Sequence, residues 1–307
     1  MNPARLRAYI YLIIASAIWG IAGPVIKFTL KELPPFTFLA YRFFLTSAIL
    51  SPLIFTKGVS FPKKPKELGL FVLIALLGTT INIGLLFWGL NLTTVLDQTI
   101  ISMAAPLGII LAGTLVLRER VTKIEKLGIF IAILGTIFII VQPLLESGGP
   151  IFAYKNLFGN ILTLISNFAW IGYVIFSKIG LKDYKFEPLS LTIGSFIIGF
   201  FTILPFSILE VGSFQGAVHL IKVASIPTHA GVIYMALLSG ALAYFLYQLG
   251  QKTIEASEAI LFTYLQTLFA IPLAVWWLKE TMSTPFILGT VLTTLGIGIA
   301  EYKRRKV

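Results

Sequence analysis

The sequence predicts an all-α integral membrane protein with ten transmembrane helices, arranged as two inverted five-helix repeats. Three observations support this prediction. Hydrophobic residues make up 57% of the chain and charged residues 12%, with a mean hydropathy of +0.92, whereas a soluble domain carries about 25% charged residues. Long apolar runs follow one another with short loops between them. The second half of the chain also repeats features of the first half in order.

The repeat is recognised from residues that recur at preserved spacings. They are Trp19 with Lys27 and Trp170 with Lys178, Pro35 with Pro52 and Pro188 with Pro205, and Gly128 with Gly135 and Gly289 with Gly296. We therefore expect one five-helix repeat over residues 1–145 and another over residues 156–307. A repeat with an odd number of spans must be inverted relative to its copy, and many secondary transporters build a site open to either side in this way.

Each expected span is an apolar run close to the roughly 20 residues that cross a hydrocarbon core. The first five runs cover about residues 8–30, 35–56, 67–91, 94–117 and 123–142. The next five cover about residues 156–179, 187–210, 228–250, 255–278 and 283–302. The first run is too long for the apolar part of a secretory signal and belongs to the repeat, so we expect a retained helix. The connector at 211–227 mixes apolar and polar residues, which favours an interfacial amphipathic helix.

Basic residues predict the orientation. Lysine and arginine gather at both ends of the chain and in the loops after the second, fourth and sixth spans, whereas the alternate loops hold only Lys31, Lys155, Lys222 and Lys279. The positive-inside rule then places the chain in the cell (plasma or inner) membrane with both termini in the cytoplasm. The same clustering argues against nucleic acid as the reason for the net charge of +11. The chain has no cysteine, so thiolate metal sites are excluded.

Two patterns resemble a known family. Trp19-Gly20 in the first span precedes Arg42 between two aromatic residues in the second, and the segment at 117–122 returns in modified form at 278–283. Together they resemble the EamA-type transporters of the drug/metabolite transporter superfamily. The resemblance implies a central cavity lined mainly by the first four helices of each repeat, with helices five and ten outside, where they can pair two copies. It also implies export or exchange of small metabolites, amino acids or amphiphilic drugs, in many members coupled to protons.

One face of the first span is expected to line that cavity. Helical steps of three and four residues bring certain polar and small residues of the first span onto one face, and the repeat matches them on the sixth span. The residues are Ser16, Trp19, Gly23 and Lys27, matched by Asn167, Trp170, Val174 and Lys178. The alternative is a helix contact through small residues, with the lysines reaching the membrane interface.

Charged groups inside the spans are expected to have a structural or functional role, because burying a charge there costs about 2.5–3.5 kcal/mol on insertion scales. Arg42 could bind a substrate carboxylate, or it could pair with an internal acid such as Asp97 or with helix-terminal carbonyls, and the structural pairing is favoured. Asp97 and Glu258 match across the repeat and are candidates for coupling or gating. The alternative, also favoured, is that they cap helix starts, as in the pair Thr94 and Asp97. Glu280 is expected to form a local ion pair.

The remaining cavity candidates are polar or aromatic residues within the spans. They are Asn82, Trp88, Tyr173, Tyr244, Gln248, Tyr264 and Gln266. Such a set suits a neutral or zwitterionic metabolite with an apolar part.

The sequence thus predicts a secondary active transporter that exports small metabolites, amino acids or amphiphilic compounds by alternating access. We expect a small-molecule substrate, protons as the coupling ion, a homodimer through helices five and ten, and no cofactor or metal. The alternatives are a lipid flippase and a membrane-embedded enzyme. The enzyme is disfavoured because His219 and His229 are the only histidines and no HExxH motif occurs.

Overall fold

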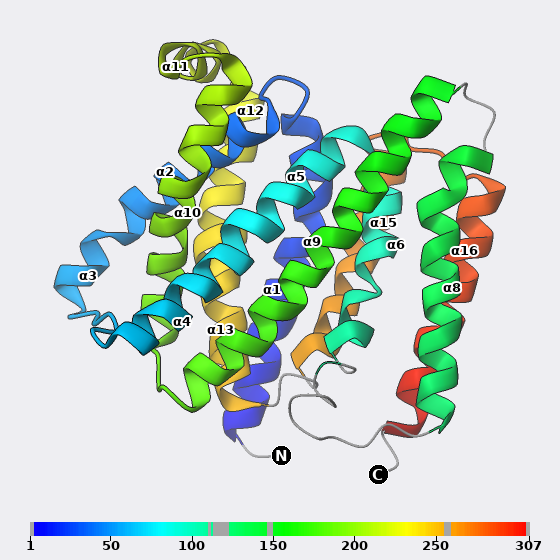
Figure 1. Ribbon diagram of the computed structural model, residues 1–307, viewed down its shortest axis with the longest axis horizontal. Helices are drawn as coiled ribbons and strands as arrows, with labels where there is room; N and C mark the ends of the chain where they lie inside the picture. The colour runs from blue at the N-terminus through cyan, green and yellow to red at the C-terminus, as the bar shows by residue number, and fades with distance from the viewer. Residues whose placement is uncertain (1–2, 110–111, 113–122, 146–149, 255–258, 305–307) are drawn as a thin grey trace.

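The computed structural model describes residues 3–109, 112, 123–145, 150–254 and 259–304. Within these ranges the chain forms helices and no strand. Figure 1 shows the helices side by side in one bundle, and α1 begins at the same edge at which α16 ends.

The helices of the first half often begin at proline, which suits the first turn because its missing N–H would be unpaired there. The elements are α1 (Pro3–Thr29), α2 (Pro35–Leu50), α3 (Pro52–Thr56), α4 (Pro65–Ala75), the π-helix η1 (Leu76–Ile81), α5 (Asn82–Leu92), α6 (Val95–Ser102) and α8 (Lys123–Leu145). Pro106 has the opposite effect, because a proline ring inside a helix clashes with the carbonyl four residues earlier. That carbonyl belongs to Ser102, where α6 ends.

The second half follows a similar order. Its elements are α9 (Pro150–Lys182), α10 (Pro188–Val211), α11 (Phe214–Val223), α12 (Ile226–Ile233), the π-helix η2 (Tyr234–Leu242), α13 (Ala243–Thr253), the 3-10 helix η3 (Ile260–Tyr264), α15 (Leu265–Trp276) and α16 (Thr284–Arg304). The helix predicted in the connector 211–227 is α11, capped where the Gly216 N–H donates to Ser213 Oγ. Its place at a membrane interface stays a prediction.

Six of these helical segments are long and apolar enough to cross a membrane. They are Pro3–Thr29, Pro35–Thr56, Pro65–Leu92, Lys155–Lys182, Pro188–Val211 and Ile226–Thr253. Shorter apolar helices occupy Val95–Ile109, Lys126–Gln142, Phe262–Trp276 and Thr284–Ile299. Every predicted span overlaps one of these segments. The protein is therefore an all-helical, multi-pass membrane protein, while the count of ten spans and their inverted arrangement stay predictions.

The two π-helices occupy corresponding places in the two halves. η1 lies between α4 and α5, and η2 lies between α12 and α13. A π segment shifts the hydrogen-bond ladder, and such segments are frequent at functional sites. Side chains from other helices bind carbonyls in both segments: Tyr244 Oη donates to Gly78 O at 3.1 Å, and Trp19 Nε1 donates to Ser239 O at 3.0 Å. The sequence predicted helix at both places but did not distinguish the π form.

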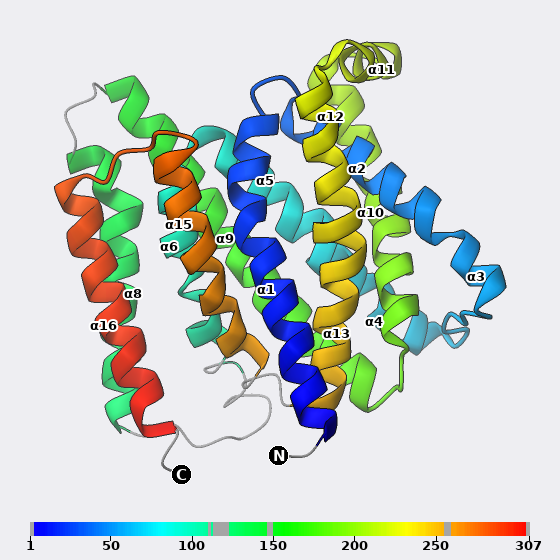
Figure 2. The ribbon, with the colours of Figure 1, turned by 180° about the vertical axis from the view of Figure 1, so that it is seen from behind.

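Helices α8 and α16 pair with each other at one end of the bundle (Figure 2). Their glycines permit a close approach. A Cβ added at Gly135 would lie 2.5 Å from Thr293 N, and one at Gly296 would lie 2.3 Å from Ala132 N. Small residues commonly form such helix contacts in membranes. These two helices lie at the outside, as the family resemblance implies, but their glycine faces are used within one chain. A homodimer would have to use their outer faces.

Candidate functional site

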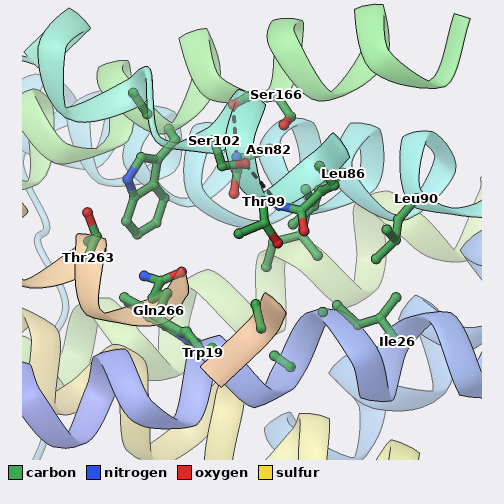
Figure 3. A pocket seen from close by; sticks show the side chains of 18 of the residues that line it. Trp19, Ile26, Asn82, Leu86, Leu90, Thr99, Ser102, Ser166, Thr263 and Gln266 are labelled. Carbon is green, nitrogen blue, oxygen red and sulfur yellow. Dashed lines mark hydrogen bonds between the residues drawn. The ribbon is translucent and has the colours of Figure 1, made fainter. Parts of the chain in front are cut away.

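A cavity of about 160 Å³ lies between α1, α5, α6, α9 and α15. This volume has room for roughly five water molecules at about 30 Å³ each, so it suits a small solute. Figure 3 shows Asn82 and Ser166 on one side of the cavity, with Trp19 and Gln266 on the other. Residues from both halves of the chain line it.

Two asparagines on the wall are fixed by neighbouring backbone. Asn82 Nδ2 donates to Ser166 O at 2.8 Å, which ties α5 to α9. Asn167 Nδ2 donates to Ile101 O at 2.9 Å, which ties α9 to α6. A third amide, Gln98 Nε2, donates to Ser102 Oγ at 2.9 Å. The polar wall is therefore held in place by hydrogen bonds before any solute enters.

Aromatic rings form the opposite part of the lining. Trp19 and Trp170 meet edge to face with their ring centroids 5.6 Å apart. Tyr244 packs against Trp19 at 5.2 Å, and Tyr247 packs against Trp170 at 5.6 Å. Such tilted contacts each contribute about 0.5–1.5 kcal/mol beyond area burial. Trp19, Trp170 and Tyr244 of this cluster line the cavity, so α1, α9 and α13 supply an aromatic part of its wall.

Arg42 also lines the cavity, with only 2% of its surface exposed. Its guanidinium carbon lies 5.6 Å from the ring centroid of Phe87 and 6.0 Å from that of Phe196. Its Nε is buried without a hydrogen-bond partner. The structural pairing favoured from the sequence, with an acid such as Asp97 or with helix-terminal carbonyls, is not formed among the described residues, where the guanidinium lies beside aromatic faces and the cavity.

Lys27 and Lys178 lie outside the lining and bind helix ends instead. Lys27 Nζ donates to Leu90 O and Thr93 O at the end of α5. Lys178 Nζ donates to Gln251 O and Ile254 O at the end of α13, both at 2.6 Å. Cations are favourable at helix C-termini because the last carbonyls carry partial negative charge. Each lysine therefore fixes one helix against another within its own half of the chain.

Asp97 lies near the start of α6, with 2% of its surface exposed, and does not line the cavity. Gln142 Nε2 donates to Asp97 Oδ1 at 2.9 Å, while Asn160 Nδ2 and Thr93 Oγ1 donate to Oδ2. The Asp97 N–H donates to Thr94 Oγ1 at 3.0 Å, as the capping interpretation requires. The carboxylate thus joins α6, α8 and α9. Its proposed counterpart Glu258 lies outside the described residues.

Glu280 binds the start of α6, so the local ion pair expected from the sequence is wrong. Its carboxylate accepts from Val95 N at 2.8 Å and Leu96 N at 2.9 Å. Unpaired N–H groups and the helix dipole make this an anion site. Burial raises the pKa of Glu280 above its ordinary value, and the hydrogen bonds from Val95 and Leu96 partly offset the rise. This contact joins the two halves of the chain.

The EamA-like transporter family matches this chain twice, over residues 6–141 and 157–301. The chain belongs to this family. It is similar to an uncharacterized transporter of Archaeoglobus fulgidus, with 26% identity over 301 residues that cover 98% of this chain and 99% of the relative. It is also similar to the uncharacterized transporter YyaM of Bacillus subtilis, with 27% identity covering 95% and 93%. A crystal structure with 17% identity shares the fold at a TM-score of 0.63, over 97% of this chain and 98% of that chain.

In this EamA-like transporter, many of the predicted candidates line the cavity. They are Trp19, Gly23, Arg42, Asn82, Asn167, Trp170, Tyr244, Tyr264 and Gln266. The others lie elsewhere: Trp88 is 38% exposed and packs on Phe36 and Phe158, whereas Gln248 is fully buried and donates to Tyr173 Oη at 3.0 Å.

Several lining residues were not singled out by the sequence. They are Gln98, Thr99, Ser102, Ser166, Ser239, Thr263 and Thr267. Serine and threonine are common in membrane helices because they can bond their own backbone, so their type alone carries little signal. The weak sequence signal was the four-residue spacing of Gln98 and Ser102, which places both on one face of a helix.

Proposed function

We propose that this membrane transporter is a secondary active exporter of small metabolites that works by alternating access in the cell membrane. Two inverted five-helix units, with both termini in the cytoplasm, would rock about the central cavity. The observation that carries the proposal is the cavity itself, because both halves of the chain supply its walls. Inverted units around a central site are a common way to expose one site to either side.

Matched contacts support two similar units. Lys27 binds the carbonyls of residues 90 and 93, and Lys178 binds those of residues 251 and 254. The two lysines are 151 residues apart and their acceptors are 161 residues apart, the same offsets that relate the repeats. Each lysine stays within one unit, so we infer that these contacts persist while the units move.

The contact between Glu280 and α6 crosses from one unit to the other and is therefore expected to change. In the proposed cycle it closes the side opposite the termini, and it separates when that side opens. Protonation of a buried carboxylate lowers the cost of keeping it from water. Proton coupling through Glu280 is therefore added to the proposal, beside the candidates Asp97 and Glu258 that the sequence suggested. Figure 1 places the start of α6 and the end of α15 at the edge away from the start of α1.

Transport into proteoliposomes tests the proposal. A panel of labelled metabolites is offered with and without an imposed pH gradient, and empty liposomes are the control. We expect at least one solute to accumulate, faster with the gradient. If no solute moves while fluorescent lipids are scrambled between leaflets, the lipid flippase replaces the metabolite transporter.

Cysteine labelling tests whether the cavity takes up water. A Cβ at Gly23 would lie 3.4 Å from Val95 Cγ1, which is ordinary contact, and the native chain has no cysteine. Gly23→Cys should react with a water-soluble maleimide. The matched control is Ala15→Cys, a fully buried position on the same helix outside the lining, which should stay unlabelled. Equal protection at both positions would contradict a wet cavity.

A further inference from the structure

The least satisfied charge among the described residues is Arg42. Within the described part of the chain its guanidinium makes no hydrogen bond or ion pair, and its Nε is enclosed without a partner. A buried cation normally has an acid or backbone carbonyl beside it, because desolvation is costly. Aromatic faces supply only part of that compensation.

Three acids within the described ranges form hydrogen bonds elsewhere in the bundle. Asp97 accepts from Gln142, Asn160 and Thr93. Glu210 accepts from the N–H groups of Phe36 and Thr37 at the start of α2. Glu280 binds α6. Arg42 therefore presents its positive charge to the cavity that it lines.

The cavity lining contains few charged groups. Among its described residues Arg42 is the one cation, and no carboxylate or histidine is present. The repeat places Ser195 at the position that matches Arg42, and Ser195 does not line the cavity. The described part of the lining thus carries a single positive charge, supplied by the first half of the chain.

We propose that Arg42 is an anion subsite and that the cavity binds small monocarboxylates with an apolar body. This inference rests on the proposed transport function and narrows its substrate class. A guanidinium binds a carboxylate through two parallel hydrogen bonds, and the rings of Trp19 and Trp170 offer an apolar surface for the rest of the solute. A dianion would leave one charge unmatched. An amino acid would place its ammonium among lining side chains that, for the residues the structure describes, include no acid.

Ligand binding to the purified protein in detergent provides the test, read from tryptophan fluorescence because Trp19 and Trp170 line the cavity. The probes are 3-phenylpropanoate and pentanoate, each compared with its primary amide, together with glutarate and phenylalanine. We expect at least one of the two acids to bind at least about tenfold more tightly than its amide, and more tightly than glutarate or phenylalanine. The inference would be overturned if each acid bound with the same affinity as its amide. It would also be overturned if neither acid bound.

Variants separate a binding role from a structural one. Arg42→Met should weaken acid binding by roughly tenfold to a hundredfold, as for hydrogen bonds to a charged group, and leave amide binding unchanged. Arg42→Lys should keep part of the preference for the acid. Lys178→Met, which removes a cation outside the lining, should keep all of it. A preference retained in Arg42→Met would overturn the inference.

The two proposals fail in different ways. Acid binding that depends on Arg42, with no solute moved in proteoliposomes, would keep the anion subsite and reject transport. Transport of a neutral solute, unaffected by Arg42→Met and without binding of either acid, would keep transport and reject the anion subsite.

Discussion

Asp97 and Arg42 are both buried charges, yet the protein treats them in opposite ways. Asp97 lies where α6, α8 and α9 meet and accepts hydrogen bonds from three side chains. The guanidinium of Arg42 lies beside the cavity and donates none to the described residues. Both are 2% exposed, so burial alone does not distinguish them.

The difference indicates how structural and functional charges can be told apart. A satisfied charge holds helices together, and losing it leaves its partners unpaired. An unsatisfied charge beside a cavity costs stability and is expected to be retained for what it binds. Stability measurements should therefore separate the two regions by the sign of the effect.

Asp97→Ala should have the largest effect. The substitution leaves Gln142 Nε2 without its acceptor. It also removes one acceptor from Thr93 and one from Asn160, which keep Asn160 Oδ1 and the carbonyls of Ile139 and Ile140 as acceptors. Hydrogen bonds to a charged group contribute about 1.5–3 kcal/mol each. We expect a loss of at least about 3 kcal/mol in the free energy of unfolding, measured by steric trapping in bicelles. Glu67→Ala is the control, because Glu67 pairs only with an exposed lysine on the surface. A loss no larger than that of the control would show that Asp97 is not structural.

Lys27→Met should have the next largest effect. Two charge-assisted bonds to the end of α5 are lost, while methionine keeps the apolar stem, so we expect a loss of about 2 kcal/mol. Lys178→Met should behave alike, because it removes the matched contact at the end of α13. The thermal midpoints of both variants in detergent provide the measurement. A large effect in one variant and none in the other would argue against equivalent units.

Glu280→Gln should have a smaller effect that depends on pH. Burial raises the pKa of Glu280 above its ordinary value of 4.5, so the folded state favours the protonated form. The stability that this protonation supplies is full below 4.5 and is lost as the pH rises through the raised pKa. Glutamine stays neutral, so the variant should gain stability relative to the native protein as pH increases over this window. Parallel melting curves from pH 4 to 8 should diverge, and curves that stay parallel would contradict the raised pKa.

Arg42→Met should have the smallest effect on stability, with the opposite sign. Removing a buried charge that has no hydrogen-bonded partner removes its desolvation cost, so the thermal midpoint should stay the same or rise. If Arg42 instead stabilised the fold, the thermal midpoint of Arg42→Met should fall by about as much as that of Lys27→Met. The same melting assay compares the two variants directly.

Much of the helical architecture could be predicted from the sequence. Every predicted span overlaps an apolar helix, because continuous apolar runs of this length leave the backbone little alternative in a membrane. The face bearing Trp19 and Gly23 reaches the cavity as predicted from helical spacing. The π-helices were not predictable, because they depend on side chains such as Tyr244 that bind displaced carbonyls from another helix.

The hydrogen-bond partners of the charged side chains were the hardest feature to predict from the sequence. Lys27 shares a helical face with Trp19, but its long side chain reaches the end of α5 rather than the cavity. Glu280 pairs with backbone N–H groups 184 and 185 residues away. Neither contact leaves a local pattern, since backbone carbonyls and N–H groups occur at every position.

By itself the sequence determined the membrane environment, the order of the helices and the duplication, because composition, periodicity and spacing are properties of the chain. Only the tertiary structure decided which buried charges are satisfied. Hydrogen bonding requires donors and acceptors within about 3 Å, and that proximity is set by how the helices pack. Helix packing places Asp97 beside three donors and Arg42 beside the cavity. Residue type and burial alone could not have predicted this difference.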